Sequence, residues 1–388
     1  MNQLPITRGQ QQAAKQAVYK RRQRVTLSIV VVVALVVIVG VANLIGDGGH
    51  SGRTVTTKPL PATTQPPKLN PVTIAAVGDT ELGNTPNLNS DPGSILAPVE
   101  QELAAPILFG NLEGTMTDNA GTSKCSAGST QCYAFRVPTS YAQVMHTAGF
   151  TVLNSANNHS HDFGTQGVAD TSTALSAAGI SQGGLPGQIA MTSDGATKVA
   201  FVDFAPYSNV NNLLDLGAAK QLIAQAKSQA PVVVVYMHAG AEGATATHVT
   251  GQEESYVGED RGNAQAFAHA AIDDGANLVL ASGPHVLRGM EWYRGNLIAY
   301  SLGDFANYNN FASVGTLSLS GILRVTLTGT GTFLHGKFIS VVLSSTGTPA
   351  VDSTNQSAQL VNQLSQEDFG SAAVTINSDG SLAPPKTT

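Results

Sequence analysis

Carboxylate, amide and imidazole side chains recur directly after five apolar segments of the chain. If these segments are parallel strands, their carboxyl ends lie at one edge of a sheet, where α/β proteins place their ligands. Zinc, manganese and iron take such ligands, and two ions about 3.5–4 Å apart can clamp a phosphoryl or acyl oxygen and activate a water molecule. The pattern predicts a site for one or two divalent ions, with these candidate ligands: Asp79, Glu113, Asn158, His238 and His285.

His159 and Asp162 belong to the same polar segment as Asn158 and follow a predicted strand. We take both as candidate catalytic residues, with Asp162 able to orient a neighbouring imidazole. The alternative is that these side chains satisfy backbone groups of the loop.

The other candidates also have structural interpretations. Asp79 and Glu113 stand beside glycines, where acidic residues often cap helices or form turns. His238 and His285 follow apolar runs and can be core histidines with satisfied hydrogen bonds. No single residue decides between these interpretations, but their recurrence at five strand ends favours a site.

The apolar, β-branched segments predict buried strands, and the Ala-rich amphipathic stretches between them predict helices. Alternation of the two predicts an α/β layered domain. The predicted strands are Val72–Val77, Ile107–Phe109, Val152–Leu153, Val199–Phe204, Val232–Met237 and Leu278–Leu280. The predicted helices are Ser140–Ala148, Val168–Ala178, Ala218–Lys227 and Asn263–Asp273.

The pattern changes after Trp292, where strand-like pieces alternate with Gly, Thr and Ser. These pieces (297–300, 316–327 and 333–343) predict a second, mainly antiparallel sheet, followed by a helix at Ser357–Gln366. The last residues, 376–388, are rich in polar residues and Pro, and we expect them to be disordered.

The first seventy residues predict a membrane anchor. Residues 25–45 carry no charge and are long enough, as a helix, to cross a bilayer. Six basic residues and no acidic one precede them, which places residues 1–24 in the cytoplasm. Residues 46–70 predict a flexible spacer. The alternative is a cleaved signal peptide, although this apolar run is longer than usual for one.

We therefore expect a single-pass protein of the plasma membrane, with a folded extracytoplasmic domain at 71–350 and a partly disordered extension at 351–388. Without the six basic residues of the tail, 14 Lys and Arg remain against 26 Asp and Glu, a net charge of −12 instead of −6. Such a surface does not attract nucleic acid. Cys125 and Cys132 predict a disulfide outside the cytoplasm, and zinc ligation is the alternative.

Five segments carry a family resemblance: VGDTELG at 77–83, GNLEGTMT at 110–117, ANNHSHDFGTQGVADT at 156–171, VVYMHAGAE at 234–242, and ASGPHVLRGMEWYRGNLIAYSLGDF at 281–305. Together, over about residues 72–310, they resemble the CapA family of poly-γ-glutamate capsule proteins, within the calcineurin-like metallophosphatase superfamily. The resemblance implies a four-layer α/β/β/α sandwich. It also implies that Asp79, Asn158, His238 and His285 bind metal, that Glu113 bridges two ions, and that His159 is an acid facing the phosphate or leaving group.

The chain departs from the family pattern at two positions. Gly283 replaces the second imidazole of the last motif, and this removes a nitrogen ligand from one metal position. Asp304 replaces the Asn of the family's Ser-Leu-Gly-Asn-Phe, so it either adds a compensating ligand or caps a turn. Arg288 and Glu242 are candidate substrate-binding residues, with Arg136 and Arg261 as further cationic helpers, and a surface position is the alternative for Arg288.

The resemblance implies a metal-dependent hydrolase or transferase acting on an anionic envelope polymer or a phosphoester. The alternative is a non-catalytic factor that binds or exports the polymer through a degenerate metal site. A membrane-bound capsule synthetase is the expected partner in either case.

Overall fold

A computed structural model describes residues 69–119, 121–126, 129 and 132–385 of the chain. Among these residues, no helix has the length and apolar character needed to span a bilayer. The predicted cytoplasmic tail, the membrane helix at 25–45 and the spacer up to residue 68 lie outside the described residues.

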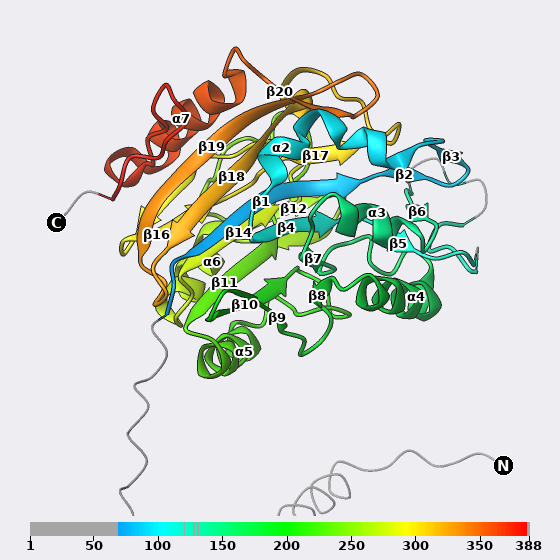
Figure 1. Cartoon of the computed structure of the whole chain (residues 1–388), viewed down its shortest axis with the longest axis horizontal. Coiled ribbons are helices and arrows are strands. Elements are labelled where there is room, and N and C mark those ends of the chain that lie inside the picture. The colour runs from blue at the N-terminus through cyan, green and yellow to red at the C-terminus, as the bar shows by residue number, and fades with distance from the viewer. Residues whose placement is uncertain (1–68, 120, 127–128, 130–131, 386–388) are drawn as a thin grey trace, which may run out of the picture. The chain divides into compact units, whose positions relative to one another are not determined.

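Two β-sheets form the centre of the domain (Figure 1). The first has eight strands in the order β20-β19-β18-β1-β4-β7-β8, with β17 also paired to β1. The second has six strands in the order β15-β16-β14-β11-β10-β9. The first sheet contains β1 (Val72–Glu81), β4 (Ile107–Leu112), β7 (Val152–Asn154), β8 (Ser181–Gly183), β17 (Asp304–Asn307), β18 (Leu319–Leu327), β19 (Phe333–Leu343) and β20 (Pro349–Val351). The second contains β9 (Ala190–Asp194), β10 (Thr197–Phe204), β11 (Val232–His238), β14 (Leu278–Ser282), β15 (Met290–Tyr293) and β16 (Asn296–Ala299).

The strands that position the candidate site run parallel within each sheet. In the first sheet, β1, β4, β7 and β8 are parallel, and in the second β10, β11 and β14 are parallel. Parallel strands buried on both faces need nearly continuous apolar sequence, which the fully buried Val232–His238 shows. The carboxyl ends of the parallel strands therefore meet at one edge of each sheet.

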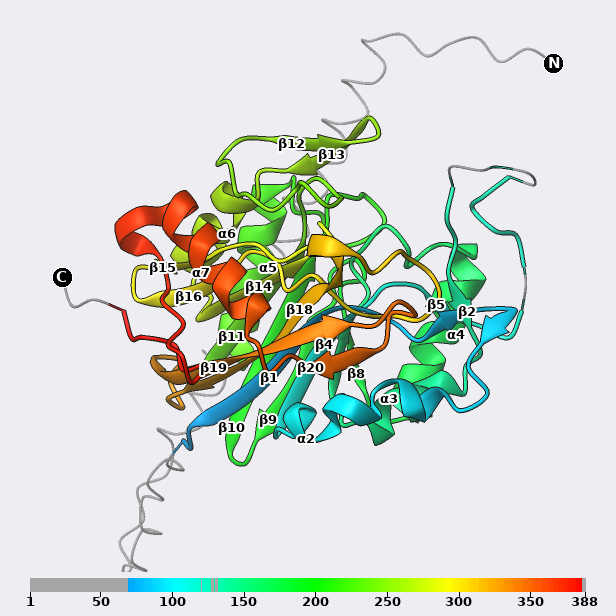
Figure 2. The same cartoon turned by 90° about the horizontal axis from the view of Figure 1, so that it is seen from above.

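Helices cover the outer faces of both sheets. One apolar cluster fills the space between the sheets, a second joins the first sheet to α3 and α4, and a third joins the second sheet to α5 and α6. The helices are α2 (Glu100–Leu103), α3 (Tyr141–Thr147), α4 (Gly164–Ala177), α5 (Leu216–Gln229), α6 (Ala264–Asp273) and α7 (Gln356–Phe369). This arrangement confirms the predicted α/β sandwich, and Figure 2 shows α5 and α6 on one side of the strands and α3 on the other.

The two helices over the second sheet begin where the sequence supplies side-chain caps. Asp215 accepts a hydrogen bond from Ala218 N at 2.9 Å, and Asn263 accepts one from Ala266 N at 2.9 Å. Each cap satisfies a backbone N–H that has no partner inside the helix. Local sequence therefore determines where α5 and α6 begin.

Short elements complete the described fold. Three pairs of short strands are β2 (Gly83–Asn84) with β3 (Asn87–Leu88), β5 (Thr115–Met116) with β6 (Arg136–Val137), and β12 (Glu254–Tyr256) with β13 (Glu259–Gly262). Four 3₁₀ turns occur at Pro92–Ile95, Ala97–Val99, Gly315–Ser318 and Gly370–Ala372. Figure 2 shows β12 and β13 at the margin of the domain, beyond α6.

The separate antiparallel sheet expected after Trp292 is wrong. Instead, β18 pairs antiparallel with the central strand β1 and continues the first sheet through β19 and β20, whereas β15 and β16 belong to the second sheet. Ile322, Leu323 and Val325 of β18 are all buried, so both faces of this strand are covered. A strand with two apolar faces is stabilised when apolar side chains cover both faces, as they do in the first sheet.

The disorder expected for residues 376–388 is also wrong for the part that the structure describes. Ile376 and Leu382 are buried, and Leu382 N donates to Gly336 O at 2.9 Å. A Cβ at Gly336 would lie 2.8 Å from Leu382 Cδ1, so the strand can accept this segment only without a side chain there. The preceding helix, α7, packs against β19 (Figure 1).

Asp203 gives the fold a pH dependence that does not involve the candidate site. It is fully buried, neither carboxylate oxygen has a hydrogen-bond partner, and burial raises its pKa to about 8. The folded protein holds this proton more tightly than the unfolded chain does. The loss of stability caused by ionising Asp203 is therefore absent below about pH 4 and grows until about pH 8. At pH 7 the cost is on the order of 4 kcal/mol.

We therefore expect Asp203→Asn to be more stable than the wild type at pH 7 and to lose this advantage near pH 4. Urea unfolding of both proteins at several pH values measures the difference. A stability difference that does not change between pH 4 and pH 8 would contradict the assignment.

Candidate metal centre

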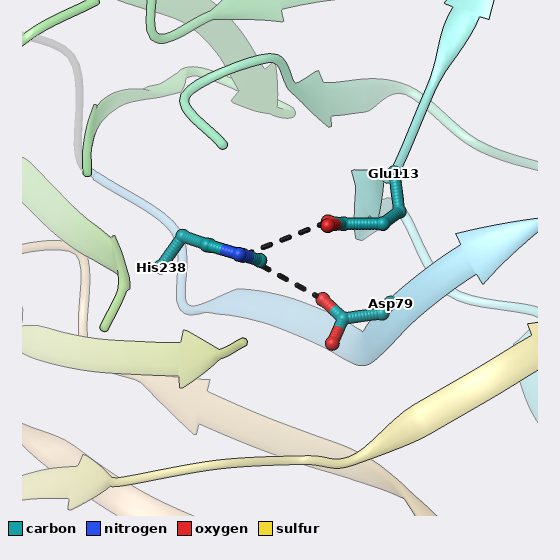
Figure 3. A group of neighbouring side chains, drawn as sticks. All are labelled: Asp79, Glu113 and His238. Atoms are coloured by element: carbon teal, nitrogen blue, oxygen red, sulfur yellow. Dashed lines mark ion pairs between the residues drawn. The ribbon is translucent and has the colours of Figure 1, made fainter. Parts of the chain in front are cut away.

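Asp79 belongs to two groups of potential metal ligands. The first group is Asp79, Glu113 and His238, and the second is Asp79, His285 and Asp304; in each group the ligand atoms lie within 4.8 Å of one another. All five residues are buried. Figure 3 shows the side chains of the first group pointing toward one another from three separate segments.

Strand pairing brings these residues together. Asp79 of β1 pairs with Asp304 of β17 on one side and with Asn111 of β4 on the other. The register of β1 against both neighbours shifts at Asp79, so the strand is irregular at the site. In the second sheet, His238 pairs with Ser282. The site therefore lies where strand ends of both sheets meet.

Asn111 fixes the two carboxylates of the first group. Its Nδ2 donates to Asp79 Oδ1 at 2.7 Å and also to Glu113 Oε2. Its Oδ1 accepts from Asn154 Nδ2 at 2.5 Å and from Asn157 Nδ2 at 2.9 Å. A single amide thus holds both acids in place and is itself oriented by two further amides. These asparagines lie at strand ends, next to the predicted ligands in the sequence. This position is the sequence signal that could have identified them.

A second set of donors reaches Asp79 from β14. Ser282 Oγ donates to Asp79 Oδ1 and is in turn bonded to Tyr236 OH. The backbone N–H of Gly283 donates to Asp79 Oδ2 at 3.2 Å. Tyr236 carries no sequence signal for this role, because an aromatic residue in a buried strand is typical of a hydrophobic core.

The carboxylates are crowded in a region with little water. Burial, followed by the charge of Asp304, raises the pKa of Asp79 to about 6, against the opposing effect of His285. Burial and the charge of Asp79 raise the pKa of Glu113 well above its usual value. Burial lowers the pKa of His238, which favours the neutral imidazole that metals bind. Burial also acts to lower the pKa of His285, but Asp304, Asp79 and Glu242 together outweigh it and raise that pKa.

The donor atoms themselves fit a divalent cation. Glu113 Oε1, His238 Nε2 and Asn158 Oδ1 are buried and have no hydrogen-bond partner. A buried polar atom without a partner costs about 1–3 kcal/mol, and a metal ion would satisfy it. Oxygen and imidazole nitrogen are suitable ligands for manganese, zinc or iron. The residues of this site can therefore hold one or two divalent ions.

His159 and Asp162 lie beside the metal centre as a bonded pair. His159 Nδ1 is 2.8 Å from Asp162 Oδ2, and His159 Nε2 is 3.9 Å from Glu113 Oε1. Burial lowers the pKa of His159 against the opposing effect of Asp162. When Nδ1–H donates to Asp162, the lone pair of Nε2 faces the carboxylate side of the site.

The comparison with known families agrees with this geometry. The model of the family described as bacterial capsule synthesis protein PGA_cap matches residues 73–309, which is more than half of the chain. The chain belongs to the PGA_cap family. This span contains every candidate metal ligand, from Asp79 to Asp304.

Curated relatives of this PGA_cap protein include the "PGA biosynthesis protein CapA" of Bacillus subtilis, 32% identical over 180 residues that cover 42% of this chain and 44% of the relative. The "Capsule biosynthesis protein CapA" of Bacillus anthracis is 30% identical over 188 residues, covering 41% and 40%. The matches thus span less than half the length of these relatives. A 5′-nucleotidase precursor from Thermus thermophilus is similar in structure, with 13% identity, a TM-score of 0.38, and coverage of 76% of this chain and 59% of that one.

The two departures from the family pattern act on different sides of the PGA_cap site. Gly283 has φ 112°, and a Cβ there would lie 3.2 Å from His238 Nε2. A side chain at position 283 would therefore lie beside the His238 ring. Asp304 Oδ1 is instead 2.7 Å from His285 Nδ1, in the second group. Asp304 thus lies among the potential ligands and not only in a turn.

The two predicted substrate-binding residues have different places. Glu242 Oε2 is 3.8 Å from His285 Nε2, and Glu242 Oε1 is 2.8 Å from Arg261 Nη1. Arg288 is buried and donates through both terminal nitrogens to Glu254, at 2.8 and 2.7 Å. The structure thus brings Glu242 to the site, whereas Arg288 is bound to Glu254 of β12.

Arg261 is the buried cation next to this edge of the site. Its Nε donates to Gly240 O at 3.2 Å and its Nη1 to Tyr207 OH at 2.8 Å. Arg136, the other proposed helper, is half-buried and lies over the Phe163 ring at 5.5 Å. Elsewhere, Cys125 and Cys132 form a disulfide with a Cα–Cα distance of 5.5 Å, the pairing favoured over zinc ligation.

Asp79→Asn provides a test with two opposite effects. Because the raised pKa of Asp79 makes its charge unfavourable above about pH 6, the metal-free variant is expected to have a higher Tm than metal-free wild type at pH 8, with a smaller gain near pH 4. Added Mn²⁺ should raise the Tm of the wild type more than that of the variant, since binding to the folded state stabilises it. Thermal scans with EDTA and with Mn²⁺ measure both effects. Equal Mn²⁺ stabilisation of the two proteins would contradict a metal-binding role for Asp79.

Proposed function

We propose that this PGA_cap protein is a metal-dependent hydrolase or transferase of the cell envelope, acting on an anionic polymer of the poly-γ-glutamate type or on a phosphoester. The observation that carries the proposal is the placement of Asp79 in two ligand groups, next to buried donor atoms that lack partners. A group of acids of this kind, buried without a cation, would destabilise the fold. Its retention at the meeting point of two sheets supports a role in binding ions.

The side chains at such a site would have different roles. Asp79, Glu113, Asn158, His238, His285 and Asp304 would hold one or two ions. A bound divalent ion would polarise a substrate oxygen and lower the pKa of a water molecule. It would also supply the positive charge that attracts an anionic substrate, which the acidic exterior expected for this domain lacks.

His159 is the proposed proton-transfer residue. Its Nδ1 is tied to Asp162, so the free nitrogen, Nε2, lies toward Glu113. With Nδ1–H fixed, Nε2 can accept a proton from an attacking group and return it to a leaving group. Glu242, placed between Arg261 and His285, would contact the substrate at the opposite side of the site.

The proposal also concerns cellular location. The apolar residues 25–45 and the basic tail before them support a single-pass plasma-membrane protein with a cytoplasmic N-terminus. Residues 25–45 would contact the lipid bilayer, and the folded domain would lie outside the cytoplasm. The names of the Bacillus relatives refer to PGA and capsule biosynthesis, which supports a membrane-bound capsule synthetase as partner.

A second candidate function is polymer binding or export without catalysis. It is favoured by Gly283, because the side chain absent at this position would face His238 Nε2, which has no partner. Relative to the family pattern, the neighbourhood of His238 would therefore lack one imidazole. Fold and motifs can persist while catalysis is lost.

Metal content and turnover distinguish the two functions. We expect the purified wild type to contain one or two equivalents of divalent metal and to hydrolyse a generic phosphodiester, and Asp79→Ala to lose both. Asp203→Asn, a change at a buried acid outside the site, is the matched control and should retain both. Metal without turnover in the wild type, after supplementation with Mn²⁺, Zn²⁺ or Fe²⁺, would favour polymer binding; no metal at all would refute the metal site.

A further inference from the structure

The two ends of the disulfide loop converge on Asp162. Lys124, directly before Cys125, places its Nζ 2.6 Å from Asp162 Oδ1, and its backbone N–H donates to the Asp162 carbonyl at 2.7 Å. At the other end of the loop, three residues after Cys132, the backbone N–H of Phe135 donates to Asp162 Oδ2 at 2.6 Å. The disulfide joins the two segments close to these contacts.

The same two segments contact His159. Lys124 Nζ donates to the carbonyl of Asn158 at 3.0 Å, and the Phe135 ring lies over the His159 ring with centroids 4.4 Å apart. His159 is also bonded to Asp162 through Nδ1 at 2.8 Å. The loop ends therefore determine both the position of Asp162 and the environment of the imidazole.

Charge and burial explain why Lys124 matters here. The Asp162 side chain is fully buried, and the Lys124 side chain is 33% exposed. Within the described part of the chain, Asp162 forms ion pairs with Lys124 and with His159, and Lys124 is the lysine of the two. Removing Lys124 leaves the charge of the buried Asp162 side chain uncompensated, which disturbs the geometry around it.

We propose that Lys124 is a positioning residue for His159, acting through Asp162, and that the Cys125–Cys132 disulfide holds Lys124 in place. With this loop closed, Asp162 Oδ2 fixes Nδ1 of the imidazole, and Nε2 lies 3.9 Å from Glu113 Oε1. The inference rests on the proposed function for its kinetic consequence, but not for its geometry. Disulfides persist outside the cytoplasm, so the arrangement would be complete in the compartment where the domain is proposed to work.

Four variants of the full chain test this inference. Lys124→Met removes the cation, Lys124→Arg keeps it, and Cys125→Ser with Cys132→Ser opens the loop. Lys220→Met is the matched control, because Lys220 Nζ is also 2.6 Å from a carboxylate, Asp274, but on an exposed surface.

The first readout needs neither metal nor turnover. In metal-free protein labelled with ¹⁵N-histidine, the hydrogen-bonded Nδ1–H of His159 should give a downfield proton resonance, which His159→Gln identifies by its loss. We expect this resonance to disappear or broaden in Lys124→Met and in the double serine variant, and to persist in Lys124→Arg and Lys220→Met.

The second readout is steady-state turnover with metal content measured in parallel. Loss of a residue that orients a functional side chain typically costs about 10- to 100-fold. We expect kcat of Lys124→Met to fall within that range with KM and metal content nearly unchanged, and Lys124→Arg to restore most of it. A Lys124→Met protein that keeps the resonance would overturn the role of Lys124, and a double serine variant that keeps it would overturn the role of the disulfide. A wild type without turnover would refute the proposed enzymatic function. The His159 resonance in the variants would then still show whether Lys124 and the disulfide position the imidazole.

Discussion

The burial of Asp79 beside Glu113 and Asp304 is the constraint on which the rest of the site depends. Three carboxylates in a region closed to water repel one another, and each loses its hydration. The fold tolerates them because strand pairing fixes their backbones and because neutral donors, above all Asn111 and Ser282, bond to Asp79. These donors orient the acids without neutralising them. The carboxylate oxygens therefore remain close together and oriented, as a bound cation would require.

Buried polar side chains gather around Asp79, where the strand ends of both sheets meet. The apolar cluster between the sheets ends near Phe109 and Tyr236, and polar residues begin directly beyond it. Asp79, His238 and Asp304 lie within strands, whereas Glu113 and His285 lie in the segments that follow β4 and β14. Loops carry His159, Glu242 and Lys124 close to this group.

Membership in the PGA_cap family and the geometry of the site answer different questions. The family match spans the candidate ligands from Asp79 to Asp304. The structure shows that these residues come together in two groups that share Asp79. It also shows that a side chain at position 283 would lie beside the His238 ring, whereas Asp304 lies beside His285.

The sequence by itself determined the central strands, the helices α3 to α7 and the polar residues that follow the strands, because buried strands need continuous apolar runs and α5 and α6 need caps such as Asp215 and Asn263. It did not determine that β18 joins β1, that Leu382 packs on Gly336, that Arg288 is bound to Glu254, or that Lys124 reaches Asp162. Each of these contacts joins residues that are 34 or more positions apart, with no local pattern linking the partners. Periodicity and capping act within a few residues, whereas distant pairings depend on how the whole chain packs.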